Sequence, residues 1–165
     1  MRNWLLAATV ATLLAAPLAN APQAAAQQSK GAQGKMSPTD AHAKAQAGEV
    51  VLIDIRTPEE WRETGVPVSA YAINMHDDPK VFAQRLTAAT GGDKSRPIAL
   101  ICRTGNRSNA LQAQLVRAGF TNVVDVSEGV VGGPNGKGWL KAGLPTRPGT
   151  MASTPPAAGA KASKP

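Results

Sequence analysis

The sequence predicts an α/β domain with a mainly parallel central sheet and helices on both faces. Short apolar runs rich in β-branched residues alternate with segments that carry helix-capping residues, as in repeated βαβ units. These runs show no apolar–polar alternation, which is typical of strands buried on both faces. The chain has 165 residues, of which 42% are hydrophobic and 18% charged, so it can bury the core of one domain of ordinary size.

Both ends of the chain are expected to lie outside this domain. Residues 1–26 combine a positive residue, a short apolar run and two small-residue cleavage sites, at 19–21 and 24–26, which is the pattern of an export signal. Because Pro22 follows the first site and disfavours cleavage there, cleavage after Ala26 is the favoured alternative of the two. The apolar run is too short for a membrane span. Residues 27–36 are typical of a flexible leader, and residues 148–165 of a disordered tail rich in Pro, Ala and Lys. We therefore expect an exported protein, periplasmic in a two-membrane cell and otherwise secreted, with no membrane attachment after cleavage.

Residues 37–147 form the predicted domain, which begins with two capped helices on either side of a strand. Ser37 is an N-cap residue, followed by proline at the first helical position and an acidic residue three positions after the cap. Residues 50–53 form a continuous apolar strand. Thr57 repeats the capping pattern and begins a short helix that ends at Gly65.

Predicted strands and helices also alternate in the second half of the domain. The predicted elements are an irregular strand over 66–75, a helix over 78–89 with the apolar stripe Val81, Phe82 and Leu86, a strand over 98–101, a helix over 108–118, a strand over 123–126 and a helical turn near Trp139.

The charge balance points to small anions as partners. The chain carries 18 basic and 11 acidic residues, a net charge of +7. The basic residues are scattered and have no interleaved aromatic residues, so no nucleic-acid partner is expected. His42 and His76 have no Cys or His neighbour at ligand spacing, so we expect neither a metal nor a cofactor. A monomer is the simplest oligomeric state.

The only cysteine, Cys102, follows the strand over 98–101 at the carboxyl end of the sheet, where α/β proteins bind ligands. The helix that begins after it offers free N–H groups and a dipole that favour an anion. Gly105 permits a positive φ, and Arg103 and Arg107 add two positive charges. Each feature stabilises a thiolate, and the arginines argue against an inert cysteine buried in the core. Cys102 is therefore a candidate nucleophile.

Several segments together resemble a single-domain rhodanese over residues 37–147. The matching segments are VLIDIR (51–56), TPEEW (57–61), AIN (72–74), CRTGNRS (102–108), GW (138–139) and AGLP (142–145).

The resemblance implies a sulfurtransferase in which Cys102 is the catalytic nucleophile. Cys102 would take the outer sulfur of thiosulfate or a similar small anionic donor as a persulfide and pass it to cyanide or a thiol. Asp54 and Arg56 would pair and support the loop, whereas Glu59 and Glu60 are interpreted as helix-start residues. The residues expected to bind the substrate are Arg103, Thr104, Gly105, Asn106, Arg107 and Ser108.

Three alternatives to a catalytic sulfurtransferase are a phosphatase, a non-catalytic binding module and a persulfide carrier. Related phosphatases have five residues between the cysteine and the arginine, whereas four separate Cys102 from Arg107, which favours sulfur chemistry. A non-catalytic binding module with this fold commonly lacks the loop cysteine, which is present here. The third alternative is a persulfide carrier whose sulfur partner is another protein.

Overall fold

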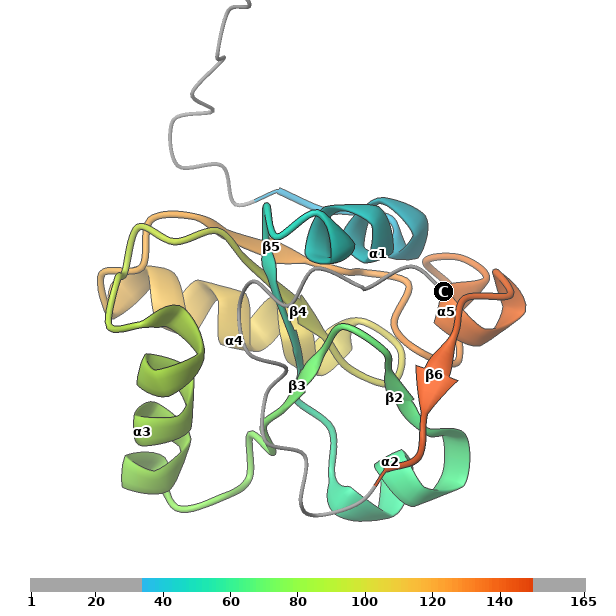
Figure 1. The fold of residues 1–165 in the computed structure, drawn as a ribbon, viewed down its shortest axis with the longest axis horizontal. Coiled ribbons are helices and arrows are strands. Elements are labelled where there is room, and N and C mark those ends of the chain that lie inside the picture. Colours follow the sequence, from blue (N-terminus) through green and yellow to red (C-terminus); the bar gives the residue numbers. More distant parts are fainter. Residues whose placement is uncertain (1–33, 150–165) are drawn as a thin grey trace, which may run out of the picture.

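The computed structural model describes residues 34–149 as a parallel four-stranded sheet with helices on both faces (Figure 1), which confirms the predicted fold class. The strand order is β3-β1-β4-β5, and all three strand pairs are parallel. The expected export signal, residues 27–33 of the leader and residues 150–165 of the tail lie outside the described residues. The sheet consists of β1 (Val51–Asp54), β3 (Tyr71–Ala72), β4 (Ile98–Ile101) and β5 (Val123–Asp125).

The first two helices begin where the sequence places capping residues. The Ser37 hydroxyl accepts the Asp40 N–H at 3.1 Å, and Thr57 and Glu60 form a reciprocal capping box. No helix within residues 34–149 has the length and apolar character needed to cross a membrane. The helices are α1 (Pro38–Gln46), α2 (Pro58–Thr64), α3 (Pro79–Thr90), α4 (Asn106–Arg117) and α5 (Gly138–Lys141).

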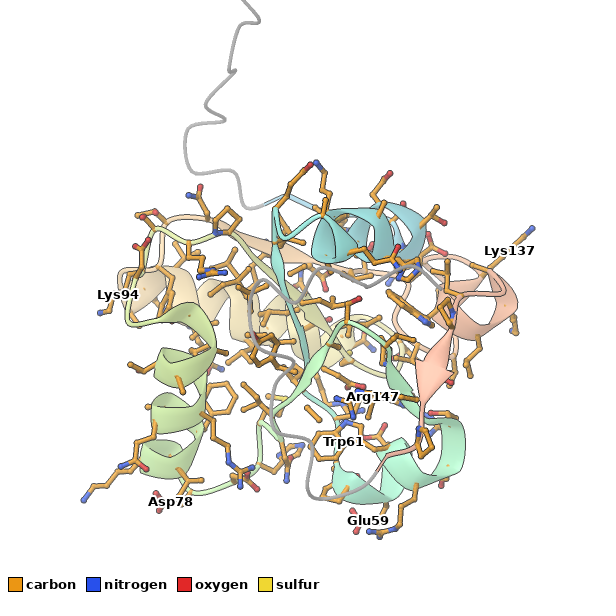
Figure 2. The ribbon with its side chains drawn as sticks, in the orientation of Figure 1. Glu59, Trp61, Asp78, Lys94, Lys137 and Arg147 are labelled. Carbon is orange, nitrogen blue, oxygen red and sulfur yellow. The ribbon has the colours of Figure 1, made fainter. Side chains whose placement is uncertain are left out.

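Each face of the sheet packs against its own group of helices. Ile53 and Leu100 belong to a cluster with residues of α3 and α4, whereas Leu52 and Ile101 belong to a second cluster with residues of α1, α2 and α5. This division follows from the alternation of side chains along a strand. Figure 1 shows α3 and α5 at opposite sides of the molecule. In Figure 2 the charged side chains of Asp78, Lys94 and Lys137 point outward, away from both clusters.

The predicted strand over 66–75 is wrong, because this segment forms two short strands in different sheets. β2 (Val66–Pro67) pairs antiparallel with β6 (Thr146–Arg147), which the sequence did not indicate, while β3 joins the main sheet. Proline has no N–H to extend a ladder, and the Ala70 N–H donates to the Pro67 carbonyl at 2.9 Å in a turn between the strands.

Three smaller predictions also need correction. Val81 is 37% exposed and lies outside the core, whereas Leu86 is buried as expected. The fourth helix begins at Asn106, two residues earlier than predicted, because Gly105 acts as its N-cap. Residues 34–36, at the end of the predicted leader, lie beside β5: the Asp125 N–H donates to the Gly34 carbonyl and the Met36 N–H to the Asp125 carbonyl, at 3.0 and 2.9 Å.

Candidate active site

Cys102 lies directly after β4, at the carboxyl edge of the sheet. Its side chain is only 1% exposed and contacts the core cluster on the α4 face. Two groups donate to Sγ: the Gly105 N–H at 3.1 Å and the Ser108 hydroxyl at 3.4 Å. The sequence argument that neighbouring arginines exclude burial is therefore wrong, although the sulfur does have polar partners.

The backbone around the sulfur is held by a left-handed glycine. Gly105 has φ +96°, which confirms the expected positive φ, and it forms the N-cap of α4. The space beside it is filled, because a Cβ there would collide with the carbonyl oxygen of Ser127. The loop is also tied to the turn after β5, where the Val130 N–H donates to the Cys102 carbonyl at 2.9 Å. The N–H beside the sulfur is thus fixed by the fold.

Both arginines of the loop pair with glutamates of α2. Arg107 forms a two-pronged pair with Glu60, with N–O distances of 2.8 and 2.6 Å. Arg103 donates to Glu63 at 3.0 Å and has a second, longer approach to Glu60 at 3.9 Å. The loop therefore does not present two free positive charges as the sequence suggested. These two arginines and two glutamates carry no net charge together.

The Glu60–Arg107 pair is coupled to the sulfur. Burial acts to raise the pKa of the Glu60 carboxyl, but hydrogen bonds from Arg107 and the Thr57 backbone, with the charges of Arg107 and Arg56, hold it below its usual value. The hydrogen bond to Glu60 is the main cause of a raised pKa for Arg107, and Cys102 adds a smaller contribution. Arg107 is thus placed to respond to charge on the sulfur.

The other predicted site residues occupy distinct places. Thr104 is half-buried in the loop, whereas Asn106 is exposed in the first turn of α4. Asp54 and Arg56 are fully buried and pair at 2.6 Å at the end of β1, next to the loop rather than within it. Arg56 also donates to the Glu60 carbonyl, and it thereby links this pair to α2.

Sequence reasoning missed three acidic residues at the site. Glu60 and Glu63 pair with the loop arginines, but in the sequence Glu60 is recognisable only as a capping residue. Asp125, at the end of β5, is 1% exposed and pairs in register with Leu100, two residues before Cys102. An acidic residue inside an otherwise apolar strand was the one available signal. No group of three potential metal ligands gathers within residues 34–149.

Comparison with known proteins places this geometry in a family. The family model for a rhodanese-like domain matches residues 37–133. The chain is 35% identical over 119 residues to thiosulfate sulfurtransferase 16, chloroplastic, of Arabidopsis thaliana, covering 68% of this chain and 91% of that protein.

Solved structures have the same fold. The crystal structure of Rv0390 from M. tuberculosis matches with a TM-score of 0.55 and 28% identity, over 70% of this chain and 98% of that one. The solution structure of the polysulfide-sulfur transferase homodimer from Wolinella succinogenes matches with a TM-score of 0.51 and 29% identity, over 70% and 78% of the two chains.

Proposed function

Because this chain belongs to the rhodanese-like domain family, whose named relatives include sulfurtransferases, we propose that it transfers a sulfane sulfur through a persulfide on Cys102. The donor is thiosulfate or a similar sulfane compound, and the acceptor is cyanide or a thiol. The single observation that carries the proposal is the Gly105 N–H, fixed 3.1 Å from a sulfur at the start of α4. A donor in this position stabilises negative charge on either the thiolate or the bound sulfur.

The reaction has two displacement steps on sulfur. The Cys102 thiolate attacks the outer sulfur of thiosulfate, a new S–S bond forms, and the old one breaks with its electron pair leaving on sulfite. Cyanide then attacks the outer sulfur of the persulfide, which yields thiocyanate and regenerates the thiolate. Charge balances in both steps, and neither step needs an oxidant or a metal.

In this scheme the sulfur donor displaces the glutamates that pair with the two loop arginines. An anionic donor that approaches Cys102 competes with Glu60 for Arg107 and with Glu63 for Arg103. Because Arg107 is half-buried and pairs through two bonds, it positions the donor, whereas the more exposed Arg103 contributes mainly long-range attraction.

The test is the intact mass of the full domain after incubation with thiosulfate and, separately, with inorganic polysulfide. We expect the mass of one sulfur atom to be gained on the peptide that contains Cys102 and to be lost on addition of cyanide. The matched control is Cys102→Ser, which keeps the approximate size of the side chain but cannot form a persulfide. It should fold normally and gain no sulfur.

The outcomes separate the candidate functions. Gain from polysulfide alone would assign a donor other than thiosulfate. Gain from neither donor, with a folded protein, would overturn small-molecule turnover and favour a binding module or a carrier loaded by another protein. Sulfur retained by Cys102→Ser would overturn the mechanism itself.

We also propose that the reaction takes place after export. The support is the pattern in residues 1–26, namely one positive residue, a short apolar run and small-residue cleavage sites. Expression of the full chain in a two-membrane host should yield a periplasmic protein that begins at Gln27. Full-length protein retained in the cytoplasm would contradict this proposal.

A further inference from the structure

The charges around the Cys102 loop cancel, although the chain as a whole is strongly basic. The chain carries a net charge of +7. Each loop arginine nevertheless pairs with a glutamate of α2, Arg107 with Glu60 and Arg103 with Glu63. These ion pairs therefore give an anionic sulfur donor no net long-range attraction, and a thiolate on the cysteine adds one negative charge.

The two glutamates are held to very different degrees. The Glu60 side chain is 12% exposed and both of its carboxylate oxygens are bound. Its Oε2 accepts the Thr57 N–H at 3.1 Å and Arg107 Nη1 at 2.8 Å, while its Oε1 accepts Arg107 Nη2 at 2.6 Å. The Glu63 side chain is 59% exposed, and within residues 34–149 its carboxylate accepts one hydrogen bond, from Arg103 at 3.0 Å. Glu63 is therefore the carboxylate that an incoming anion displaces more easily.

Arg103 is the cation that this displacement releases. It follows Cys102 directly in the chain, and its side chain is 43% exposed. Its second approach, to Glu60 at 3.9 Å, is too long for a hydrogen bond. The Val131 N–H holds the Arg103 carbonyl at 3.0 Å, so the backbone of the loop need not move when the side chain exchanges one partner for another.

We propose that Glu63 is a specificity-determining residue that occupies Arg103 and thereby weakens the binding of doubly charged sulfur donors more than that of singly charged ones. The Coulomb energy of an anion beside a free arginine is proportional to the charge of the anion. Occupation of Arg103 by Glu63 therefore costs a dianion such as thiosulfate more than a monoanion such as methanethiosulfonate. The inference rests on the proposed function, because it concerns the donor of the same reaction.

The two donors transfer sulfur by the same displacement, so they differ mainly in charge. The Cys102 thiolate attacks the outer sulfur of methanethiosulfonate, and a new S–S bond forms. The bond to the oxidised sulfur breaks, and its electron pair leaves on methanesulfinate. Two negative charges are present before and after the step, and no oxidant is needed. A difference between the two donors therefore reports on charge rather than on a different reaction.

The experiment measures the equilibrium binding of thiosulfate and of methanethiosulfonate to the purified protein with Cys102→Ser, which cannot react. The NMR signal of the Gly105 N–H, 3.1 Å from the sulfur in the native protein, gives both dissociation constants. Addition of Glu63→Gln should tighten thiosulfate binding roughly fivefold, which is the upper range for an exposed ion pair. Methanethiosulfonate binding should tighten only about twofold, because the Coulomb energy is halved.

Glu59→Gln is the matched control. It removes the same charge from the same helix, and the Glu59 side chain is 67% exposed, but it pairs with Arg62 at 2.8 Å and lies at the outer surface (Figure 2). It should leave both dissociation constants within about twofold of their starting values. A second control adds Arg103→Gln. With no Arg103 to release, Glu63→Gln should then change thiosulfate binding by less than about twofold.

Several results would overturn the inference. Equal tightening for the two anions in Glu63→Gln, or equal tightening in Glu59→Gln, would indicate a general change of surface charge. The full effect on the Arg103→Gln background would mean that Glu63 does not act through Arg103. A Gly105 signal that responds to neither anion would mean that no anion binds at the loop.

A kinetic measurement separates this inference from the proposed function. With Cys102 intact, Glu63→Gln should lower the KM for thiosulfate by more than it changes kcat, a division that a loss of packing does not produce. Absence of sulfur transfer from either donor, with the binding pattern intact, would contradict only the proposed function. Normal transfer, with both dissociation constants unchanged in Glu63→Gln, would contradict only the role of Glu63.

Discussion

Strands β1 and β4 lie side by side and end at the same edge of the sheet, and an arginine follows each of them within two residues. After β1, Arg56 is fully buried and each of its three nitrogens donates. Nε bonds to Asp54, Nη1 to Thr64 Oγ1 and the Glu60 carbonyl, and Nη2 to Asp54 and the Gly65 carbonyl. This arginine has no donor nitrogen left over for a ligand.

After β4 the arrangement is different. Arg103 and Arg107 are partly exposed and each pairs with glutamate side chains of α2, while the Cys102 sulfur of the same loop is bonded by a backbone N–H and a hydroxyl. The first arginine is saturated and structural, whereas the second pair can exchange partners. The role of an arginine beside a strand end is therefore set by how many of its donors are already bound inside the fold, and not by its position.

Loss of Arg56 should cause the largest effect on stability. Arg56→Ala leaves the buried Asp54 carboxylate without its partner, and removal of one member of a buried ion pair typically costs about 3–5 kcal/mol. The free energy of unfolding, from urea denaturation of each variant, measures this. The matched control is Arg62→Ala, which breaks an exposed pair with Glu59 on α2 and should cost below about 1 kcal/mol (Figure 2 shows Glu59 at the outer surface). Equal costs for the two variants would contradict the distinction between the strand ends.

At the end of β4 the corresponding structural residue is a glycine. Gly105→Ala forces a left-handed conformation on alanine, which costs about 1–3 kcal/mol, and places a Cβ against the Ser127 carbonyl. The Gly105 N–H should then move away from Cys102, so we expect persulfide loading to fall at least tenfold, about the worth of one hydrogen bond to a charged group.

The matched control for this variant is Gly48→Ala. Gly48 also has a positive φ, of +74°, but it has open space where a Cβ would lie. It should lose only about 1–2 kcal/mol, the cost of the left-handed conformation, and keep full loading. Normal loading in Gly105→Ala would show that the sulfur does not depend on this N–H.

The sequence was sufficient for those parts of the fold that local signals determine. Ser37 and Thr57 begin helices because their side chains satisfy free N–H groups, and the run over 98–101 is β4 to the residue. Local signals failed at Val66 and Tyr71, whose strand partners are separated from them along the chain. The partner of Val66 is Arg147, about eighty residues later, and no pattern in 66–75 indicates that pairing.

The features of the site likewise divide into those that local sequence predicts and those that tertiary packing determines. The sequence identified Cys102 as a candidate and predicted the positive φ of Gly105, because both follow from a strand–loop–helix pattern. It did not predict that Glu60 would neutralise Arg107, since the two residues are 47 positions apart and meet only when α2 packs beside the loop. A charge near a site in the sequence is therefore free or paired according to tertiary packing.

The smallest predicted effect is on the pH dependence of stability, and it tests whether the β4 arginines are held as loosely as the comparison implies. The Glu60 pKa is below its usual value in the folded protein, so Glu60 contributes stability above its unfolded pKa of about 4.3 and loses that contribution as pH falls through the folded value. Glu60→Gln can keep the capping bond but not the charge. It should be less stable than the native protein by up to about 1 kcal/mol at pH 7, and the difference should shrink as the pH falls below the unfolded pKa of Glu60. Urea denaturation of both proteins at several pH values measures this, with Glu63→Gln as the more exposed control.

A loss of about 3 kcal/mol or more at pH 7, as expected for Arg56→Ala, would contradict the distinction between the two strand ends. Arg107 would then be as firmly built into the fold as Arg56, and the arginines at the two strand ends would have the same role.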